Sequence, residues 1–227
     1  MPYRWILFDL DNTLYDFDAS SVYALRITFE EFGVNHSPEN IAIYQEVNHQ
    51  CWTDFENGKM DFATLRNIRF KLFAEAINKD LDGKKMSDRY LYLLSTTDFK
   101  IEGATALLDY LKPRYNLVVV TNGLKEVKRP QLSKPGIAHY FKAIIISEEV
   151  GVSKPHKGFF DHTFNAMGNP DKAETIIIGD SLNSDIRGGH DYGIDTCWFN
   201  PRQKVNDSTV KPTFEINKLD ELLKIIE

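Results

Sequence analysis

Five short apolar runs constrain the fold of this chain more than any other feature of its sequence. They are rich in β-branched or aromatic residues and read "WILF" (5–8), "LVVVT" (117–121), "AIIIS" (143–147), "TIIIG" (175–179) and "TCWF" (196–199). Apolar and polar residues do not alternate within them, which is typical of strands buried on both faces. The runs therefore predict a parallel sheet that is covered by helices on both sides.

The stretches between these runs are long enough to form crossover helices. We predict helices at 103–112, about 124–134, 156–167 and 183–191, and a closing amphipathic helix in the tail "NKLDELLKIIE" (217–227). Strands that alternate with helices in this way favour an α/β fold with a doubly wound, open parallel sheet of the Rossmann-like kind.

Residues 16–96 carry no such run and show only helical periodicity. Predicted helices start near Ser20, at Ser37 and at Asp61, where Ser or Asp can cap a helix N-terminus, and a fourth helix is predicted in 84–97. We therefore predict an α/β core formed by 1–15 and 97–227, with an all-helical cap at 16–96 inserted after the first strand.

Composition and charge exclude several classes of function. The chain has 227 residues, of which 42% are hydrophobic, and its formal net charge of -6 offers no electrostatic footprint for nucleic acid or an anionic membrane. Its two cysteines, Cys51 and Cys197, lack a metal-ligand spacing, and no apolar run reaches membrane-spanning length. We expect a cytoplasmic monomer or homodimer whose partner is a small molecule.

Polar residues of catalytic type follow the predicted strands where these end. Ligands of open parallel sheets bind beyond the carboxyl ends of the strands, and Asp9, Thr121 and Asp180 lie at such ends. In "DLDNT" (9–13), Asp9 and Asp11 suit a nucleophile and a general acid/base. An ordinary strand-to-loop turn, in which Asp and Asn are common, is the competing interpretation.

Two further segments are candidates for binding an anion at the same edge. Thr121 and Asn122 in "TNG" offer a hydroxyl and backbone N–H groups at a helix start, although the same letters also form ordinary turns. Lys154 precedes Pro155, which suits the first turn of a helix. We expect this proline to hold the Lys154 ammonium towards a phosphate; a solvated surface lysine is the alternative.

Asp180 and Asp185 follow another apolar run, in "GDSLNSD" (179–185). Asp180 is a candidate metal ligand, and Asp185 is a candidate to support the metal and to hold Lys154. Four carboxylates at one sheet edge would repel one another strongly unless a cation neutralised them. Because Mg²⁺ prefers a few carboxylates together with water and substrate phosphate, the set predicts a magnesium-dependent site for a phosphate ester.

These four segments together resemble the motifs of the haloacid dehalogenase (HAD) superfamily, phosphatase branch. "DLDNT", "TNG", Lys154-Pro155 and "GDSLNSD" stand in the family's order, and the insert at 16–96 is similar to the family's cap. Longer stretches such as "SEEVGVSKPHKGFFDHTFNAMG" (147–168) look like the house-cleaning pyrimidine 5′-nucleotidases of this superfamily. The resemblance implies hydrolysis of pyrimidine nucleoside monophosphates with Mg²⁺ as cofactor.

The resemblance also implies a role for each residue. Asp9 would attack phosphorus to form an aspartyl-phosphate, and Asp11 would protonate the leaving oxygen and then activate water. Thr121 and the backbone near Asn122 would bind the phosphoryl oxygens, and Lys154 would neutralise charge. The implied magnesium ligands are Asp9, the Asp11 backbone carbonyl and Asp180, with Asp185 in support.

Other functions share parts of this pattern. A sugar-phosphate phosphatase or a phosphomutase would carry the same core residues. A 2-haloacid dehalogenase uses the aspartate nucleophile without a metal and needs no acid at Asp11. A non-catalytic binding protein would have lost a motif residue, and none is lost here. In the insert, Trp52 is expected either to pack in a helical core or to stack on a base.

Overall fold

The computed structural model describes residues 3–133 and 136–227 and divides into two compact units. The core unit comprises Met1–Phe17, Asp98–Lys125 and Leu132–Glu227, and the helical unit comprises Asp18–Thr97 and Glu126–Gln131. The sequence-based boundaries place 126–131 in the core instead. The predicted division into a core and an inserted cap at 16–96 stays a prediction.

The core unit is built on a parallel sheet with the strand order β3-β2-β1-β4-β5-β6 in the described part of the chain. All five apolar runs form strands of this sheet, which confirms the predicted α/β class with a helical insertion after the first strand. The strands are β1 (Trp5–Phe8), β2 (Asn116–Thr121), β3 (Ala143–Ile146), β4 (Thr175–Gly179), β5 (Asp195–Phe199) and β6 (Phe214–Ile216).

The edge strand β6 was not predicted from the sequence. It pairs with β5 through Cys197↔Phe214 and Phe199↔Ile216. The strand has three residues, and the exposed Glu215 interrupts its apolar character. A run this short carries no periodicity that distinguishes it from a loop.

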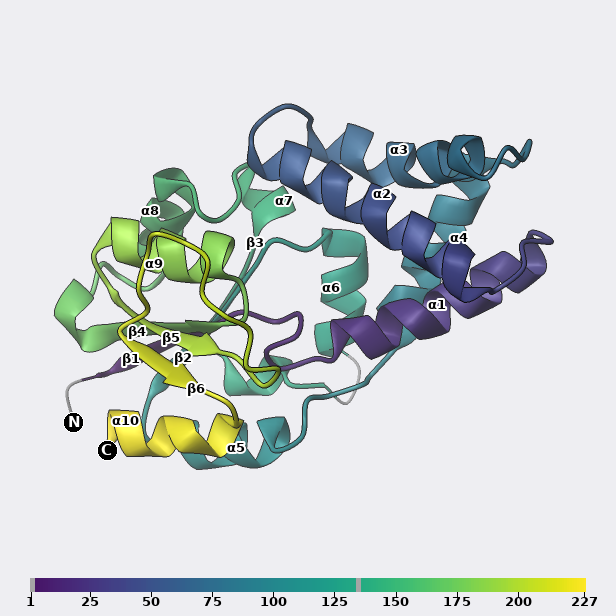
Figure 1. Ribbon diagram of the computed structural model, residues 1–227. Helices are drawn as coiled ribbons and strands as arrows, with labels where there is room; N and C mark the ends of the chain where they lie inside the picture. The colour runs from purple at the N-terminus through teal and green to yellow at the C-terminus, as the bar shows by residue number, and fades with distance from the viewer. Residues whose placement is uncertain (1–2, 134–135) are drawn as a thin grey trace. The chain divides into compact units, whose positions relative to one another are not determined.

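Helices cover both faces of the sheet, as the continuous apolar strands require (Figure 1). On one face, Ile6 and Phe8 of β1 belong to a buried cluster with Leu108 of α5 and Ile226 of α10. On the other face, Leu7 packs in a second cluster with residues of α8. The helices of this unit are α5 (Ala104–Leu111), α6 (Lys125–Ser133, shared with the helical unit), α7 (Ser147–Val150), α8 (Lys157–Ala166), α9 (Arg187–Tyr192) and α10 (Leu223–Ile226).

One detail of the predicted crossover helices lies outside the described residues, and another differs from the structure. Residue 134, the last of the helix predicted at 124–134, lies outside the described residues. Helix α8 begins at Lys157 and is capped by the side chain of His156, so Pro155 precedes the helix instead of forming its first turn. Asn122, which bonds to the backbone of Lys154 on both its N–H and its carbonyl, holds this segment outside the helix.

The helical unit consists of α1 (Phe17–Glu31), α2 (Pro38–Glu56), α3 (Phe62–Ala76) and α4 (Gly83–Thr96), together with part of α6. The predicted caps Ser37 and Asp61 accept hydrogen bonds from the backbone N–H groups of Asn40 and Thr64. The predicted start near Ser20 is wrong, because α1 begins at Phe17 and Ser20 is buried within the helix.

Aromatic side chains form the centre of the helical unit. The rings of Phe29 and Phe73 stack with their centroids 4.9 Å apart, and Tyr44 packs against Phe70 at 4.7 Å. The α6 segment joins this unit through an ion pair between Arg66 and Glu126 at 2.6 Å. Every helix in the described part of the chain is too short or too polar to cross a membrane.

The order of the strands determines where a site can form. Successive strands add on one side of β1 as far as β3, and the chain then returns to place β4 on the other side of β1. The carboxyl ends of β2, β1 and β4 are therefore neighbours at the point where the strand order reverses, which is where open α/β sheets bind ligands.

Truncation of a sheet residue tests the assignment of the core. Ile177 in β4 is fully buried, so Ile177→Ala should lower the free energy of unfolding by about 2–5 kcal/mol through lost burial and the cavity left behind. Val205, which is 87% exposed, is the control, and Val205→Ala should change it by less than about 0.5 kcal/mol. Urea unfolding measures both; equal effects would contradict the described core.

Candidate active site

Asp9 lies directly after β1 and begins the site. Its backbone N–H donates to the carbonyl of Ile178 on β4 at 2.9 Å, which extends the strand pairing to the edge of the sheet. The side chain is 7% exposed. Thr13, at the end of the "DLDNT" turn, is fully buried and donates its hydroxyl to Asp9 Oδ2 at 3.3 Å. One carboxylate oxygen is thereby oriented from within the same motif.

Lys154 places a fully buried ammonium beside this carboxylate. Its Nζ donates to Asp9 Oδ1 at 2.7 Å, to Asp185 Oδ1 at 2.6 Å and to the carbonyl oxygen of Val120 at 2.7 Å. All three N–H groups of the ammonium are thus used. Its side chain extends from the loop before α8 to the ends of β1 and β2 and to the segment after β4. The alternative of a solvated surface lysine is therefore wrong.

Asn122 holds the main chain that carries Lys154. Its Oδ1 accepts from the Lys154 N–H and its Nδ2 donates to the Lys154 carbonyl, each at 2.9 Å. The sequence analysis predicted a role only for the backbone N–H of Asn122, as part of an anion-binding loop. The side chain instead joins the β2 loop to the Lys154 loop and fixes where the ammonium points.

Asp185 is the buried partner of Lys154. Besides the bond to the ammonium, its Oδ2 accepts from the backbone N–H of Ser181 at 3.1 Å. The carboxylate lies directly against Gly179, because a Cβ built on that glycine would be 2.2 Å from the Asp185 Cγ. A side chain at position 179 would displace Asp185, so the close approach requires glycine there.

Asp180 completes a group of three carboxylates with Asp9 and Asp185. One oxygen from each lies within 4.8 Å of the others. Asp180 is only partly buried, unlike Asp185. The indole N–H of Trp198 on β5 donates to the Asp180 carbonyl at 2.9 Å and fixes the loop.

Thr121 and Asp11 lie beside this group without joining it. Thr121 is 1% exposed, and its hydroxyl oxygen accepts from the Gly123 N–H at 3.2 Å. The hydroxyl proton remains available to a further acceptor. Asp11 is partly buried and precedes Asn12, which has a φ of 58° in the tight turn that returns the chain to Tyr15.

Burial and neighbouring negative charges shift the pKa values of the charged groups in this site. Burial raises the pKa of the Asp9 carboxyl to about 7 against the opposing effect of the Lys154 ammonium, and Asp185 adds to the rise. Burial, together with Asp9 and Asp185, holds the pKa of Asp180 well above its ordinary value. Burial would lower the pKa of Lys154, but the two carboxylates outweigh it and the pKa is raised.

The donor set fits a hard divalent cation. Three carboxylates of the described residues face one ammonium, which leaves two negative charges in excess when all three are ionised. Carboxylate oxygens are the ligands that Mg²⁺ takes in proteins. Asp185 is fully buried with both oxygens hydrogen-bonded, whereas Asp180 is partly exposed. That Asp9 and Asp180 bind the cation directly with Asp185 in support stays a prediction.

Three residues of this site, Thr13, Gly179 and Trp198, had no assigned role in the sequence analysis, and no role was assigned to the side chain of Asn122. Thr13 orients Asp9, the Asn122 side chain holds Lys154, and Gly179 makes room for Asp185. Trp198 was placed among strand residues only. A glycine between an apolar run and Asp180 was the available signal for Gly179; the side-chain bonds of the other residues depend on tertiary contacts that leave no local pattern.

Known proteins resemble this chain over its whole length. The profile of the family described as Haloacid dehalogenase-like hydrolase matches residues 6–199. The HAD-hydrolase YfnB of Bacillus subtilis (strain 168) is 37% identical over 224 residues, which cover 99% of this chain and 95% of that protein. A crystal structure of YfnB bound to magnesium has a TM-score of 0.93 at 36% identity and covers 100% of both chains.

Two further relatives have names that state an activity. The pyrimidine 5′-nucleotidase YjjG of Escherichia coli (strain K12) is 33% identical over 226 residues, which cover 100% of this chain and 99% of YjjG. The pyrimidine 5′-nucleotidase PynA of Streptococcus pneumoniae (strain ATCC BAA-255 / R6) is 35% identical over 228 residues, which cover 100% of this chain and 96% of PynA.

Removal of the buried ammonium should destabilise the fold. Lys154→Met leaves the Asp9 and Asp185 carboxylates buried without their cation, which should cost about 3–5 kcal/mol of unfolding free energy. Lys157→Met removes an exposed lysine paired with Asp161 and should cost less than about 1 kcal/mol. Urea unfolding compares them. If the two variants were equally stable, Lys154 would not hold the group together.

Binding of Mg²⁺ should stabilise the protein through the same carboxylates. At a concentration 100 times the Kd, a ligand of the folded state adds about 2.7 kcal/mol, so Mg²⁺ should raise the melting temperature relative to EDTA. Asp180→Asn should reduce this shift strongly, and Asp207→Asn, at an exposed position, should leave it unchanged. A shift that survives in Asp180→Asn would place the cation elsewhere.

Proposed function

Since this chain belongs to the haloacid dehalogenase-like hydrolases, we propose that it hydrolyses phosphomonoesters with Mg²⁺ and forms an aspartyl-phosphate on Asp9. The proposal is carried by the arrangement around Lys154. A buried ammonium is bonded to the Asp9 carboxylate at 2.7 Å, in a group of carboxylates that still lacks positive charge. Such a site suits a divalent cation and the dianionic phosphate of an ester.

The proposed reaction has two steps. In the first, a carboxylate oxygen of Asp9 forms a bond to phosphorus, the bond from phosphorus to the ester oxygen breaks, and Asp11 donates a proton to the departing alcohol. In the second, Asp11 takes a proton from water, the water oxygen attacks phosphorus, and the bond to Asp9 breaks. Inorganic phosphate leaves, and both aspartates return to their initial states.

The neighbouring residues position and stabilise these groups. Lys154 fixes Asp9 Oδ1 and places its positive charge where negative charge collects on the phosphoryl oxygens. The Thr121 hydroxyl and the backbone N–H of Asn122 donate to those oxygens. Bound Mg²⁺, held by Asp9, Asp180 and the Asp11 carbonyl with Asp185 in support, would neutralise the phosphate and the carboxylate that must approach each other.

We further propose that the substrate is a pyrimidine nucleoside monophosphate. Support comes from YjjG and PynA, whose names state this activity and which align with the whole of this chain. The core residues around Lys154 would serve a sugar phosphate or a mutase equally well, because they contact the phosphoryl group alone. The choice of leaving group therefore has to come from other residues.

Phosphate release from a substrate panel tests this proposal. Uridine and cytidine 5′-monophosphates should be hydrolysed with Mg²⁺ and not with EDTA, and purine nucleotides and sugar phosphates should react much more slowly. Activity concentrated on sugar phosphates would reject the nucleotidase. Interconversion of phosphate esters without release of phosphate would indicate a mutase.

Replacement of the nucleophile gives a sharper test of the mechanism. Asp9→Asn retains the size of the side chain but removes the attacking carboxylate, so turnover of every phosphate ester should fall below detection. Activity within about tenfold of the wild type corresponds to only ~1.4 kcal/mol of transition-state stabilisation and would exclude Asp9 as the nucleophile. Circular dichroism checks that the variant is folded.

A further inference from the structure

The loop after β5 brings a second lysine to the edge of the sheet where the candidate site lies. Strands β4 and β5 pair through Gly179↔Trp198, so the chain leaves both strands at the same carboxyl edge. The indole N–H of Trp198 also donates to the Asp180 carbonyl at 2.9 Å. The loop that begins at Asn200 therefore starts beside a candidate metal ligand, and both belong to the core unit.

Asn200 gives this loop a fixed shape. Its side chain is 2% exposed. Its Oδ1 accepts from the Lys204 N–H and its Nδ2 donates to the Lys204 carbonyl, each at 2.9 Å. Its own N–H donates to the Ile216 carbonyl on β6 at 2.8 Å, which ties it to the sheet. Asn122 holds the main chain of Lys154 with the same pair of bonds.

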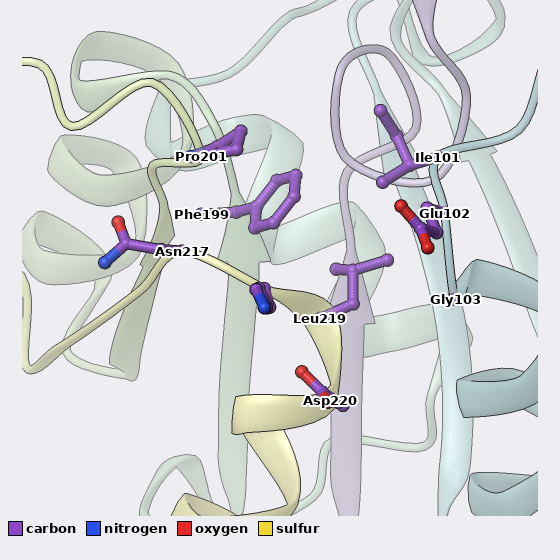
Figure 2. A pocket seen from close by; sticks show the side chains of 9 residues that line it. Ile101, Glu102, Gly103, Phe199, Pro201, Asn217, Leu219 and Asp220 are labelled. Atoms are coloured by element: carbon purple, nitrogen blue, oxygen red, sulfur yellow. The ribbon is translucent and has the colours of Figure 1, made fainter.

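The residues on either side of Asn200 anchor the start of the loop by apolar packing. Phe199 and Pro201 both line a pocket that Leu219 also lines (Figure 2). Phe199 is 3% exposed and belongs to the buried cluster on the α5 face of the sheet. The main chain that leads to Lys204 is therefore fixed on both sides of the buried asparagine.

The Lys204 ammonium lies near the carboxylates without a direct partner. Its side chain is exposed and forms no ion pair with a carboxylate of the described residues. Burial and the neighbouring carboxylates raise the pKa of the Asp180 carboxyl, and the charge of Lys204 opposes this rise. Lys154 has no N–H left for a ligand, because protein groups accept from all three. The N–H groups of Lys204 are available.

We propose that Lys204 is a second cation of the site, which attracts the phosphate ester and weakens the binding of Mg²⁺; the part on the ester rests on the proposed function. A positive charge near both ligands acts on them in opposite directions, because it attracts a dianion and repels a divalent cation. Lys204 reduces by one the excess of two negative charges that the three ionised carboxylates have over Lys154.

Calorimetric titration with Mg²⁺ tests the effect on the metal without any substrate. Lys204→Met should bind Mg²⁺ roughly two- to fivefold more tightly than the wild type, the size of effect expected for one exposed charge. Lys204→Arg keeps the charge and should match the wild type. The control is Lys211→Met, which removes another exposed lysine between β5 and β6 and should also match the wild type.

Steady-state kinetics with p-nitrophenyl phosphate test the effect on the ester. This ester has neither a base nor a sugar, so the result does not depend on the natural leaving group. At saturating Mg²⁺ and low salt, Lys204→Met should raise KM about two- to fivefold and leave kcat within about twofold. High salt should remove the difference in KM, because mobile ions screen an exposed charge.

The opposite signs of the two effects distinguish charge from structure. Tighter binding of Mg²⁺ together with a higher KM in Lys204→Met would support the proposal, because a damaged site would bind both ligands more weakly. Any other combination, or a Lys204→Arg variant that behaves like Lys204→Met, would overturn it. A wild type that hydrolyses no phosphate ester would reject the proposed function, and the calorimetric result would then decide the role of Lys204 alone.

Discussion

The buried ammonium of Lys154 is the interaction on which the candidate site depends. It connects the end of β1 through Asp9, the end of β2 through the Val120 carbonyl and the segment after β4 through Asp185. Buried ion pairs add little to stability, because desolvation offsets their attraction. This interaction matters for where it places the charges. It fixes the carboxylates of Asp9 and Asp185, and together with Asp180 they keep an excess of negative charge that a divalent cation can balance.

Much of this site could be predicted from the sequence, because the topology of a parallel sheet brings strand ends together. Asp9, Thr121 and Asp180 were each recognised as the polar residue after an apolar run, and their meeting follows from the strand order. The side-chain bonds of Asn122 to the Lys154 backbone could not be predicted, since they join loops that are 32 residues apart. For the same reason Pro155 was misplaced in a helix.

The most direct test of the central claim is to look for the covalent intermediate. The protein is mixed with ³²P-labelled uridine 5′-monophosphate and Mg²⁺, quenched with acid within one turnover, digested and analysed by mass spectrometry. The account predicts an acid-stable, hydroxylamine-sensitive phosphoryl group on the peptide that carries Asp9, and none in Asp9→Asn. Turnover that proceeds with no label on the protein, or with the label on another residue, would contradict it.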